Sequence, residues 1–268
     1  MLTMTLAAAP AELKIGSYNL RTNSDKAPND WESRAPRAAA VIKQEKFDIF
    51  GTQEVQKWHI ASITALGYKV IGEPREYIEK AEYSAVFYNP ESLELLNSRT
   101  FWLSQTPNVP ESRSWNTSCV RICTYGIFKH KASGKIFLFA NTHLDHRSAP
   151  AKYYGMKLII KELSQFPKEM PVILTGDFNS RPGSAPVKVI DTFLTDARKC
   201  AKKVLPGPVQ TFHKYRKDPA ARPIQVPIDY IYVRPDTVQV NSFQVIDDFK
   251  NGLASSDHFP LAATVVLK

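Results

Sequence analysis

Two polar side chains at the end of an apolar run give the first indication of chemistry in this sequence. Residues 171–180, PVILTGDFNS, begin like a buried strand and then present Asp177 and Asn179 on either side of Phe178. Because side chains alternate along a strand, the two polar groups face one way and Phe178 faces the core. A carboxylate orients or deprotonates water and a carboxamide donates to a phosphoryl oxygen, so the pair suits phosphoryl chemistry. The end of an ordinary strand has the same residue types, so this pair alone does not identify a catalytic site.

Further polar residues lie at the ends of other apolar runs. They are Asn19, Glu54, His143, Asp229, Asp257 and His258. Polar groups at one edge of stacked sheets would converge on a single cleft. Their types suit metal-assisted phosphoester cleavage, which needs oxygen ligands for Mg²⁺, a base and donors to the phosphate. Taken singly, each has a simpler explanation, since a lone glutamate is usually a surface charge and a lone histidine usually a satisfied core or surface group.

The elements that must position these residues alternate between strands and helices. Strands are predicted at 14–20, 47–52, 68–72, 84–88, 93–102, 120–128, 135–141, 172–174, 228–233 and 262–267. Helices are predicted at 31–46, 58–66, 149–166 and 184–193. Hairpin-like neighbours early and late in the chain favour an α/β layered sandwich with largely antiparallel sheets. No linker, repeat or low-complexity run divides the chain, so residues 12–268 are expected to form one domain.

Composition narrows the class of protein without identifying a partner. The 268 residues are 43% hydrophobic, enough for a large core, and the formal net charge is +9. This charge suits a polyanionic partner, but the lysines and arginines are scattered, and a solvated basic surface explains most of them. The three cysteines lack metal-type spacing, which argues against a disulfide framework or zinc site. Cys119 and Cys123, evenly spaced in a strand-like run, are expected to face the core.

Residues 1–11 are expected to be a leader. Within them LTMTLAAA, residues 2–9, looks like the end of a secretory h-region with small residues near Ala7 and Ala9, but no basic n-region precedes it. A truncated signal peptide and a disordered leader both fit, and the first favours a secreted or periplasmic protein over a cytoplasmic one. No stretch is long enough to span a membrane, so no stable membrane insertion is expected. We expect a monomer.

Six motifs in order resemble those of a known family. SYNLR, TQEV, NTHLD, GDFNS, IDYIYV and SSDHFPL are similar to motifs of the endonuclease/exonuclease/phosphatase superfamily. This superfamily includes pancreatic-type deoxyribonucleases, abasic-site endonucleases, inositol-polyphosphate 5-phosphatases, sphingomyelinases and deadenylases. One such motif is a weak signal, but six in order from about residue 14 to the C-terminus are specific. The resemblance implies a four-layer α/β sandwich, in which two mostly antiparallel β-sheets pack face to face with helices outside.

The resemblance also implies a role for each matching residue. Glu54 matches the family's metal-binding glutamate, with Asn19 beside it, and Asp257 matches a metal-proximal carboxylate. Asp177 matches the residue that aligns the attacking water, and Asn179 the residue that hydrogen-bonds the phosphate.

The two histidines complete the implied catalytic set. His143 and His258 match histidines that contact the scissile phosphate and stabilise the pentacovalent transition state. Asp229 matches the carboxylate that fixes the tautomer of His258, and Glu82 stands where the deoxyribonuclease branch places the partner of His143. The implied mechanism is in-line attack of water on phosphorus without a covalent intermediate, with Mg²⁺ or Mn²⁺ neutralising the developing charge.

Departures from the deoxyribonuclease pattern weaken the case for double-stranded DNA as substrate. Gln56 stands where that branch has an arginine and Lys80 where it has a tyrosine, and the disulfides of the secreted enzymes are absent. The signatures of the lipid and inositol phosphatases are absent too. Residues 101–125, FWLSQTPNVPESRSWNTSCVRICTY, instead resemble a bacterial branch with no settled substrate, loosely related to the deadenylases.

Several residues in and after that stretch are candidates for lining the substrate cleft. They are Arg121, Trp115, His213, Arg147 and Trp102. Structural alternatives stay open: core packing or a loop anchor for the tryptophans, an ion pair for Arg121, and a solvated loop for His213.

These observations predict a divalent-metal-dependent phosphoesterase, with three hypotheses for its action. The first is a phosphodiesterase acting on nucleic acid, single-stranded or RNA, which the basic charge supports. The second is a phosphatase or phosphodiesterase acting on a small phosphorylated sugar, inositol or lipid headgroup. The third is a non-catalytic binding protein on the same scaffold. Steep salt dependence of binding would favour the first, and salt-insensitive hydrolysis of a small monoester the second.

Overall fold

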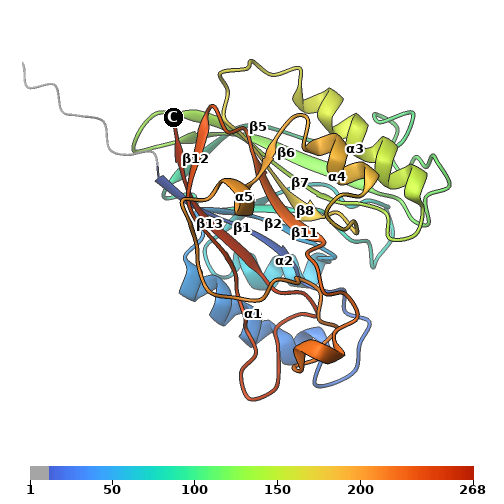
Figure 1. Cartoon of the computed structure of the whole chain (residues 1–268). Helices are drawn as coiled ribbons and strands as arrows, with labels where there is room; N and C mark the ends of the chain where they lie inside the picture. Colours follow the sequence, from blue (N-terminus) through green and yellow to red (C-terminus); the bar gives the residue numbers. More distant parts are fainter. Residues whose placement is uncertain (1–11) are drawn as a thin grey trace, which may run out of the picture.

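Two mixed β-sheets lie face to face at the centre of the molecule, for which the computed structural model describes residues 12–268 (Figure 1). The 7-stranded sheet contains β1 (Glu12–Asn19), β2 (Ile49–Gln53), β3 (Lys69–Ile71), β4 (Val86–Tyr88), β10 (Lys203–Val204), β12 (Val238–Val245) and β13 (Leu261–Leu267). The 6-stranded sheet contains β5 (Leu93–Trp102), β6 (Ile122–His130), β7 (Ile136–His143), β8 (Val172–Asp177), β9 (Thr195–Asp196) and β11 (Asp229–Val233). The spatial orders are β10-β12-β13-β1-β2-β4-β3 and β5-β6-β7-β8-β11-β9.

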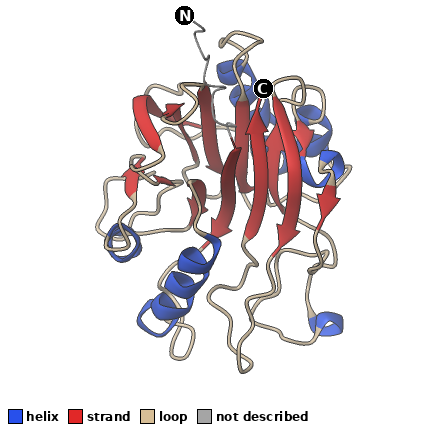
Figure 2. Cartoon of the chain, turned by 90° about the vertical axis from the view of Figure 1, so that its left-hand side faces the viewer, coloured by secondary structure: helices blue, strands red, loops and turns tan. Residues whose placement is uncertain are grey.

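Helices cover the outer faces of both sheets (Figure 2). Two of them, α1 (Trp31–Glu45) and α2 (Lys57–Thr64), pack against β2 and β4, whereas α3 (Ala149–Leu163) and α4 (Ala185–Ile190) pack against β7 and β8. The short helices α5 (Ala197–Cys200) and η1 (Pro219–Ala221) lie in the connections around β10. The layers run helix, sheet, sheet, helix, which confirms the predicted four-layer α/β sandwich.

Local sequence explains why α1 forms where the pattern predicts a helix. Asp30 accepts a hydrogen bond from the Ser33 N–H ahead of the first turn, and Lys46 ends the helix in the left-handed conformation. Ala38, Val41 and Ile42 are buried on the face toward the sheet. Their spacing of three and four residues is the helical period that the sequence shows.

Strand β12 has no counterpart among the predicted elements. Its sequence, VQVNSFQV, buries Val238, Val240 and Phe243, but the pairing with β13 shifts register between Val240 and Ser242. This irregularity inserts an extra residue and breaks the strict alternation by which half-buried strands are recognised.

Strand direction brings the predicted site residues to one edge of the sheets. β1 and β2 are parallel, as are β7 and β8, so both pairs end at this edge, and His143 lies directly across from Asp177. β11 runs antiparallel to β8 and therefore begins there, with Asp229 opposite Asp177 on its other side. β13 is antiparallel to β1, so residues just before it, including His258, reach the same edge. Most of the other ladders are antiparallel, as predicted.

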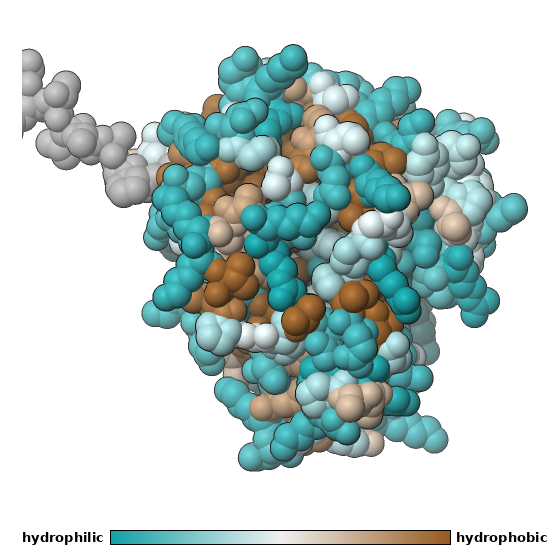
Figure 3. All heavy atoms as spheres, viewed as in Figure 1, coloured by the Kyte–Doolittle hydropathy of each residue, from teal (hydrophilic) through white to brown (hydrophobic). Residues whose placement is uncertain are grey.

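The surface carries the scattered polar groups that the composition suggests. On the face shown in Figure 3, hydrophilic side chains predominate and apolar side chains form small separate areas. Among residues 12–268, no helix combines the length and apolar character needed to cross a bilayer. The predicted leader, residues 1–11, lies outside the described residues.

Candidate active site

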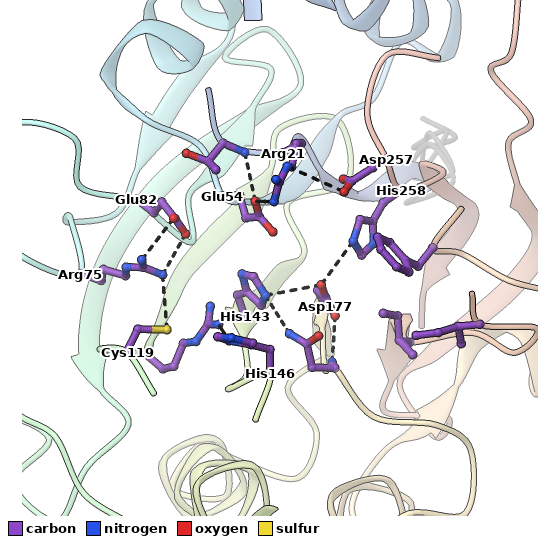
Figure 4. Close-up of a pocket in the computed structure, with 16 residues that line it drawn as sticks. Arg21, Glu54, Arg75, Glu82, Cys119, His143, His146, Asp177, Asp257 and His258 are labelled. Atoms are coloured by element: carbon purple, nitrogen blue, oxygen red, sulfur yellow. Dashed lines mark hydrogen bonds and ion pairs between the residues drawn. The ribbon is translucent and has the colours of Figure 1, made fainter. Parts of the chain in front are cut away.

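The common edge of the two sheets opens into a cleft of about 370 Å³ (Figure 4). Eight of the predicted site residues line it: Glu54, Glu82, Arg121, His143, Asp177, Asn179, Asp257 and His258. Asn19 and Asp229 lie directly behind this lining, hydrogen-bonded to Asp177 and His258 respectively. A cleft of this volume is of the size that small-molecule ligands fill.

The strand that delivers Asp177 depends on close backbone packing. A Cβ at Gly176 would collide with the carbonyl oxygen of Thr142 on the neighbouring strand β7, so the position before Asp177 requires glycine. Phe178 is fully buried and stacks on Tyr230 with the ring centroids 5.0 Å apart. The predicted split, with polar groups toward the cleft and Phe178 toward the core, is therefore confirmed.

The chain turns sharply where it leaves the strands at this edge. Arg21, Glu54 and Asn179 adopt left-handed backbone conformations, with φ of 53°, 60° and 46°. This region costs a residue other than glycine about 1–2 kcal/mol. Such conformations persist where surrounding contacts fix them, and they cluster at functional sites.

His258 is a buried histidine that stays charged because it is hydrogen-bonded to a carboxylate. Its Nδ1 donates to Asp229 Oδ2 at 2.9 Å, which confirms the predicted pairing, and its Nε2 lies 3.8 Å from Asp177 Oδ2. Burial by itself lowers the pKa of His258, but the charges of Asp229 and Asp177 and the hydrogen bond to Asp229 outweigh it and raise that pKa to about 10. The imidazolium can therefore donate to a phosphoryl oxygen at neutral pH.

Asp177 is a buried carboxylate held between fixed hydrogen-bond donors. Burial and the nearby charge of Asp229 raise its pKa to about 7, although His258 and the Asn179 N–H partly offset them. The Asn179 N–H donates to Oδ1 at 2.8 Å, and Asn19 Nδ2 donates to Oδ2 at 3.1 Å. A carboxylate with a pKa near the working pH, held by fixed donors, is suited to accept a proton.

His143 has the opposite electrostatic character to His258. Burial, followed by the charges of Arg121 and Arg75, holds its pKa well below the usual range, so the ring is neutral. Asn179 Nδ2 lies 2.9 Å from His143 Nε2 and also donates to the Leu144 carbonyl at 3.1 Å. Because an amide nitrogen only donates, His143 Nε2 accepts here and the ring proton sits on Nδ1.

The carboxylate oxygens of Glu54 and Asp257, near Asp177, form the candidate metal-binding region. Asn19 Nδ2 bridges Glu54 Oε1 at 3.2 Å and Asp177 Oδ2 at 3.1 Å. The guanidinium of Arg21 lies between Glu54 and Asp257, with nitrogen–oxygen distances of 3.6 and 3.8 Å. Arg21 pairs more closely with Asp25, at 3.0 and 3.3 Å, than with either of these carboxylates. The carboxylates of the half-buried Glu54 and the buried Asp257 are thus only weakly neutralised, and such a donor set fits a hard divalent cation.

A second group of possible ligand atoms has another role. Atoms of Asp177, Asp229 and His258 lie within 4.8 Å of one another. However, His258 Nδ1 and Asp229 Oδ2 bind each other, which leaves them unavailable to an ion. Glu54 and Asp257 are therefore the better ligands. Burial raises the pKa of Glu54, but Arg21 and the Thr22 N–H outweigh burial and lower it overall, which keeps that carboxylate charged.

The predicted pairing of Glu82 with His143 is not formed. Glu82 instead binds Arg75 at two points, with distances of 2.8 and 3.2 Å. A guanidinium presents two parallel donors to a carboxylate, which an imidazole cannot match. The sequence contains no signal that Arg75 would reach this position.

Among the candidates for substrate binding, only Arg121 lies in the cleft lining. His213 is fully buried between Phe249 and Phe259, so the solvated-loop and substrate-facing interpretations are both wrong for it. Trp115 stacks on Tyr154 and anchors a loop through its carbonyl, which accepts from the Ser148 hydroxyl.

The two remaining candidates also lie outside the lining. Arg147 is exposed, and its backbone N–H donates to Asp145. Trp102 is buried, and its indole N–H donates to the Arg75 carbonyl at 2.9 Å, so its role is packing and support.

Other residues in the lining were not predicted as site residues. They are Arg21, Thr22, Arg75, Cys119, His146, Phe212, Ile224 and Ile228. Arg21 closes the SYNLR motif, which was a usable signal, but nothing local distinguishes the others from surface or core residues. Cys123 faces the core as expected, whereas Cys119 faces the cleft because β6 begins only at Ile122 and strand alternation does not reach position 119.

Comparison with known proteins agrees with this geometry. The model of the Endonuclease/Exonuclease/phosphatase family matches residues 16–258. The chain belongs to this family. It is thus a hydrolase that acts on phosphoesters, which removes the hypothesis of a non-catalytic binding protein.

Solved structures and curated proteins extend the comparison. An endonuclease/exonuclease/phosphatase from Bacteroides vulgatus is 34% identical, with a TM-score of 0.89 over 96% of this chain and 99% of that one. A mannosyl-6-phosphatase from Bacteroides thetaiotaomicron is 32% identical, with a TM-score of 0.86 over 95% of this chain and 100% of that one. Protein angel from Drosophila melanogaster is 24% identical over 168 residues, which are 60% of this chain and 47% of that protein. The match therefore spans about half the length of Protein angel.

Proposed function

We propose that the protein is a divalent-metal-dependent phosphomonoesterase that acts on a small phosphorylated sugar. The proposal depends mainly on one observation, the burial of Arg121 without a neighbouring carboxylate among the described residues. Its side chain lines the cleft, is only 6% exposed, and has no carboxylate within ion-pair distance among residues 12–268. Nη2 lies 3.2 Å from His146 Nδ1, and Nε has no hydrogen-bond partner among the described residues.

A buried guanidinium without an anion calls for a ligand that supplies one. Burying a charged side chain away from water costs roughly several kcal/mol unless a nearby opposite charge compensates it. A phosphomonoester carries about −1.5 to −2 charge at neutral pH, whereas a phosphodiester carries about −1. The extra positive charge of Arg121 beside His143 and His258 therefore matches a monoester better than a diester. The identity of 32% with a mannosyl-6-phosphatase over nearly the whole chain supports a sugar as the esterified group.

The residues of the cleft divide the work of hydrolysis. Asp177 accepts a proton from the attacking water, and Asn179 orients this carboxylate through its N–H. His258 and Arg121 donate to phosphoryl oxygens as negative charge develops on them.

Glu54 and Asp257 would hold Mg²⁺ or Mn²⁺ through hard oxygen atoms. When bound, this ion would neutralise negative charge on the phosphate. Asn19 keeps the metal-side and water-side carboxylates at a fixed separation, because one amide group donates to both Glu54 and Asp177.

The test compares monoesters with diesters. Purified protein in Mg²⁺ or Mn²⁺ is assayed on hexose 6-phosphates, on bis(p-nitrophenyl) phosphate, and on single-stranded DNA and RNA. We expect phosphate release from the hexose phosphates, and its loss with EDTA or in the Asp177→Ala variant. Cleavage of DNA or RNA while the hexose phosphates remain intact would overturn the proposal in favour of a nuclease.

A variant of Arg121 tests the observation itself. Arg121→Gln should lower kcat/KM for monoesters about 10- to 100-fold more than for diesters, because one charge-assisted contact is lost. Arg147→Gln is the matched control, since Arg147 is an exposed arginine outside the cleft lining. An equal effect of Arg121→Gln on both ester classes would contradict the assignment.

A further inference from the structure

The cleft extends beyond the residues that act on the phosphate. Figure 4 shows Asp257, His258 and Asp177 at one end and Arg75, Glu82 and Cys119 at the other, with His143 between them. The reaction described above uses the first end and the middle. The second end is polar, lined by described side chains, and has no assigned role.

The ion pair of Arg75 and Glu82 forms the wall of this second end. Both side chains are 17% exposed, and their two contacts measure 2.8 and 3.2 Å. The backbone fixes the pair as well, because the Arg75 N–H donates to the Glu82 carbonyl at 2.9 Å. The Trp102 indole N–H donates to the Arg75 carbonyl at 2.9 Å. The pair is thus held rigidly at the cleft surface, which is the condition for selective binding.

Donor and acceptor capacity remains on this pair after its internal contacts are made. Arg75 has five N–H donors. One on Nη1 and one on Nη2 point at Glu82, and the buried Nε lies 3.5 Å from Glu76, so the donor capacity that remains is on Nη2 and on Nη1, which lies 4.0 Å from Cys119 Sγ. The Glu82 carboxylate has about four acceptor sites, of which Arg75 occupies two. A hydroxyl group both donates and accepts, so an adjacent donor and acceptor suit neighbouring hydroxyl groups such as those of a sugar.

The geometry of in-line displacement places the leaving group at this end. The attacking water and the leaving oxygen lie on opposite sides of phosphorus. Asp177, which handles the water, and the Arg75–Glu82 pair lie on opposite sides of His143 in Figure 4. An ester whose phosphate sits between His143, His258 and Arg121 would therefore extend toward Arg75 and Glu82.

We propose that Arg75 and Glu82 form a subsite that binds hydroxyl groups of the sugar leaving group and so selects among phosphomonoesters. This inference rests on the proposed phosphomonoesterase function. It adds a role for Glu82 that differs from the expected support of His143, and it gives a function to an ion pair that the hydrolytic step does not use.

The test uses two phosphomonoesters that differ in the leaving group. One is mannose 6-phosphate, which has hydroxyl groups, and the other is p-nitrophenyl phosphate, which has none on its leaving group. The measured quantity is the ratio of kcat/KM for the sugar phosphate to that for the aryl phosphate. Glu82→Gln should lower this ratio about 10-fold or more, mainly through a higher KM for the sugar phosphate.

Glu76 provides a matched control. It also contacts Arg75, at 3.5 Å, but it pairs with Arg113 at 2.9 Å and does not belong to the cleft lining. Glu76→Gln removes a comparable negative charge beside Arg75 and should leave the ratio within about twofold of the wild-type value. If Glu76→Gln lowers the ratio as much as Glu82→Gln does, a general effect on Arg75 explains the result and the subsite is wrong.

The same assays distinguish a failure of the proposed phosphomonoesterase function from a failure of the Arg75–Glu82 subsite. If wild-type protein hydrolyses neither monoester but cleaves diesters, the proposed function fails and the subsite with it. If wild-type protein hydrolyses both monoesters and Glu82→Gln leaves the ratio unchanged, only the subsite is overturned. Retained turnover of p-nitrophenyl phosphate shows that each variant is folded, so a changed ratio reports on recognition.

Discussion

Replacing Arg34 with lysine should impair catalysis even though Arg34 does not belong to the cleft lining. Arg34 is a fully buried side chain on α1, with no carboxylate within ion-pair distance among residues 12–268. Its guanidinium donates to five backbone carbonyls: those of Leu20 (2.6 Å), Arg21 (2.8 Å), Thr22 (3.5 Å), Asn29 (2.7 Å) and Ser255 (3.0 Å). It therefore ties the loop after β1 to the loop before β13, and these loops carry Arg21, Asp257 and His258.

The size of the effect follows from these contacts. A lysine ammonium is a compact group with three donors, and we expect it to leave about two of the five carbonyls unpaired. Each unpaired buried group costs about 1–3 kcal/mol, which gives a loss of about 2–6 kcal/mol. For a chain of this size such a loss lowers Tm by about 10 °C, so the variant still folds at 20 °C. Displacement of the two loops should lower kcat/KM about 10- to 100-fold at that temperature.

The assay measures Tm, kcat, KM and the Mg²⁺ concentration at half-maximal activity for Arg34→Lys and a matched control. Arg234→Lys is that control, because buried Arg234 donates to the carbonyls of Pro167, Lys168 and Met170 outside the cleft lining. We expect both variants to lose stability and only Arg34→Lys to lose activity and require more Mg²⁺. If both lose activity in proportion to stability, Arg34 is merely structural and the reasoning is refuted.

Three further predictions concern the centre of the site. Asp229→Asn removes the charge that raises the pKa of His258 to about 10, so His258 should lose its proton at a lower pH. In a pH–rate profile the alkaline decline of activity should therefore move to lower pH than in the wild type, and an unmoved alkaline limb would contradict this role of Asp229. Because Asp177 must be deprotonated, wild-type activity should rise as pH increases through about 7, and a flat profile there argues against Asp177 as the proton acceptor. Gly176→Ala should cost about 1–3 kcal/mol by collision with Thr142, measured by urea unfolding, and an unchanged midpoint contradicts this packing.

The sequence by itself determined the chemical groups of the site and the elements that carry them. Apolar runs that end in Asn19, His143 and Asp177 predict strands with functional ends, because side-chain alternation and strand length are local properties of the chain. The burial of Phe178 beside Asp177 follows from the same alternation. Strand β12 escaped prediction because its register shift breaks the local period.

Only the tertiary structure decided which groups share a contact. Glu82 pairs with Arg75 rather than His143, and Arg121 is buried with no carboxylate within ion-pair distance in the described part of the chain, because burial and neighbours depend on how distant segments pack. A guanidinium on the surface and one in a cleft look identical in sequence. The order of strands places β13 beside β1 and so brings the beginning and the end of the chain into one site. Electrostatic roles follow from these distances, because a charge acts on whatever lies near it in space rather than in sequence.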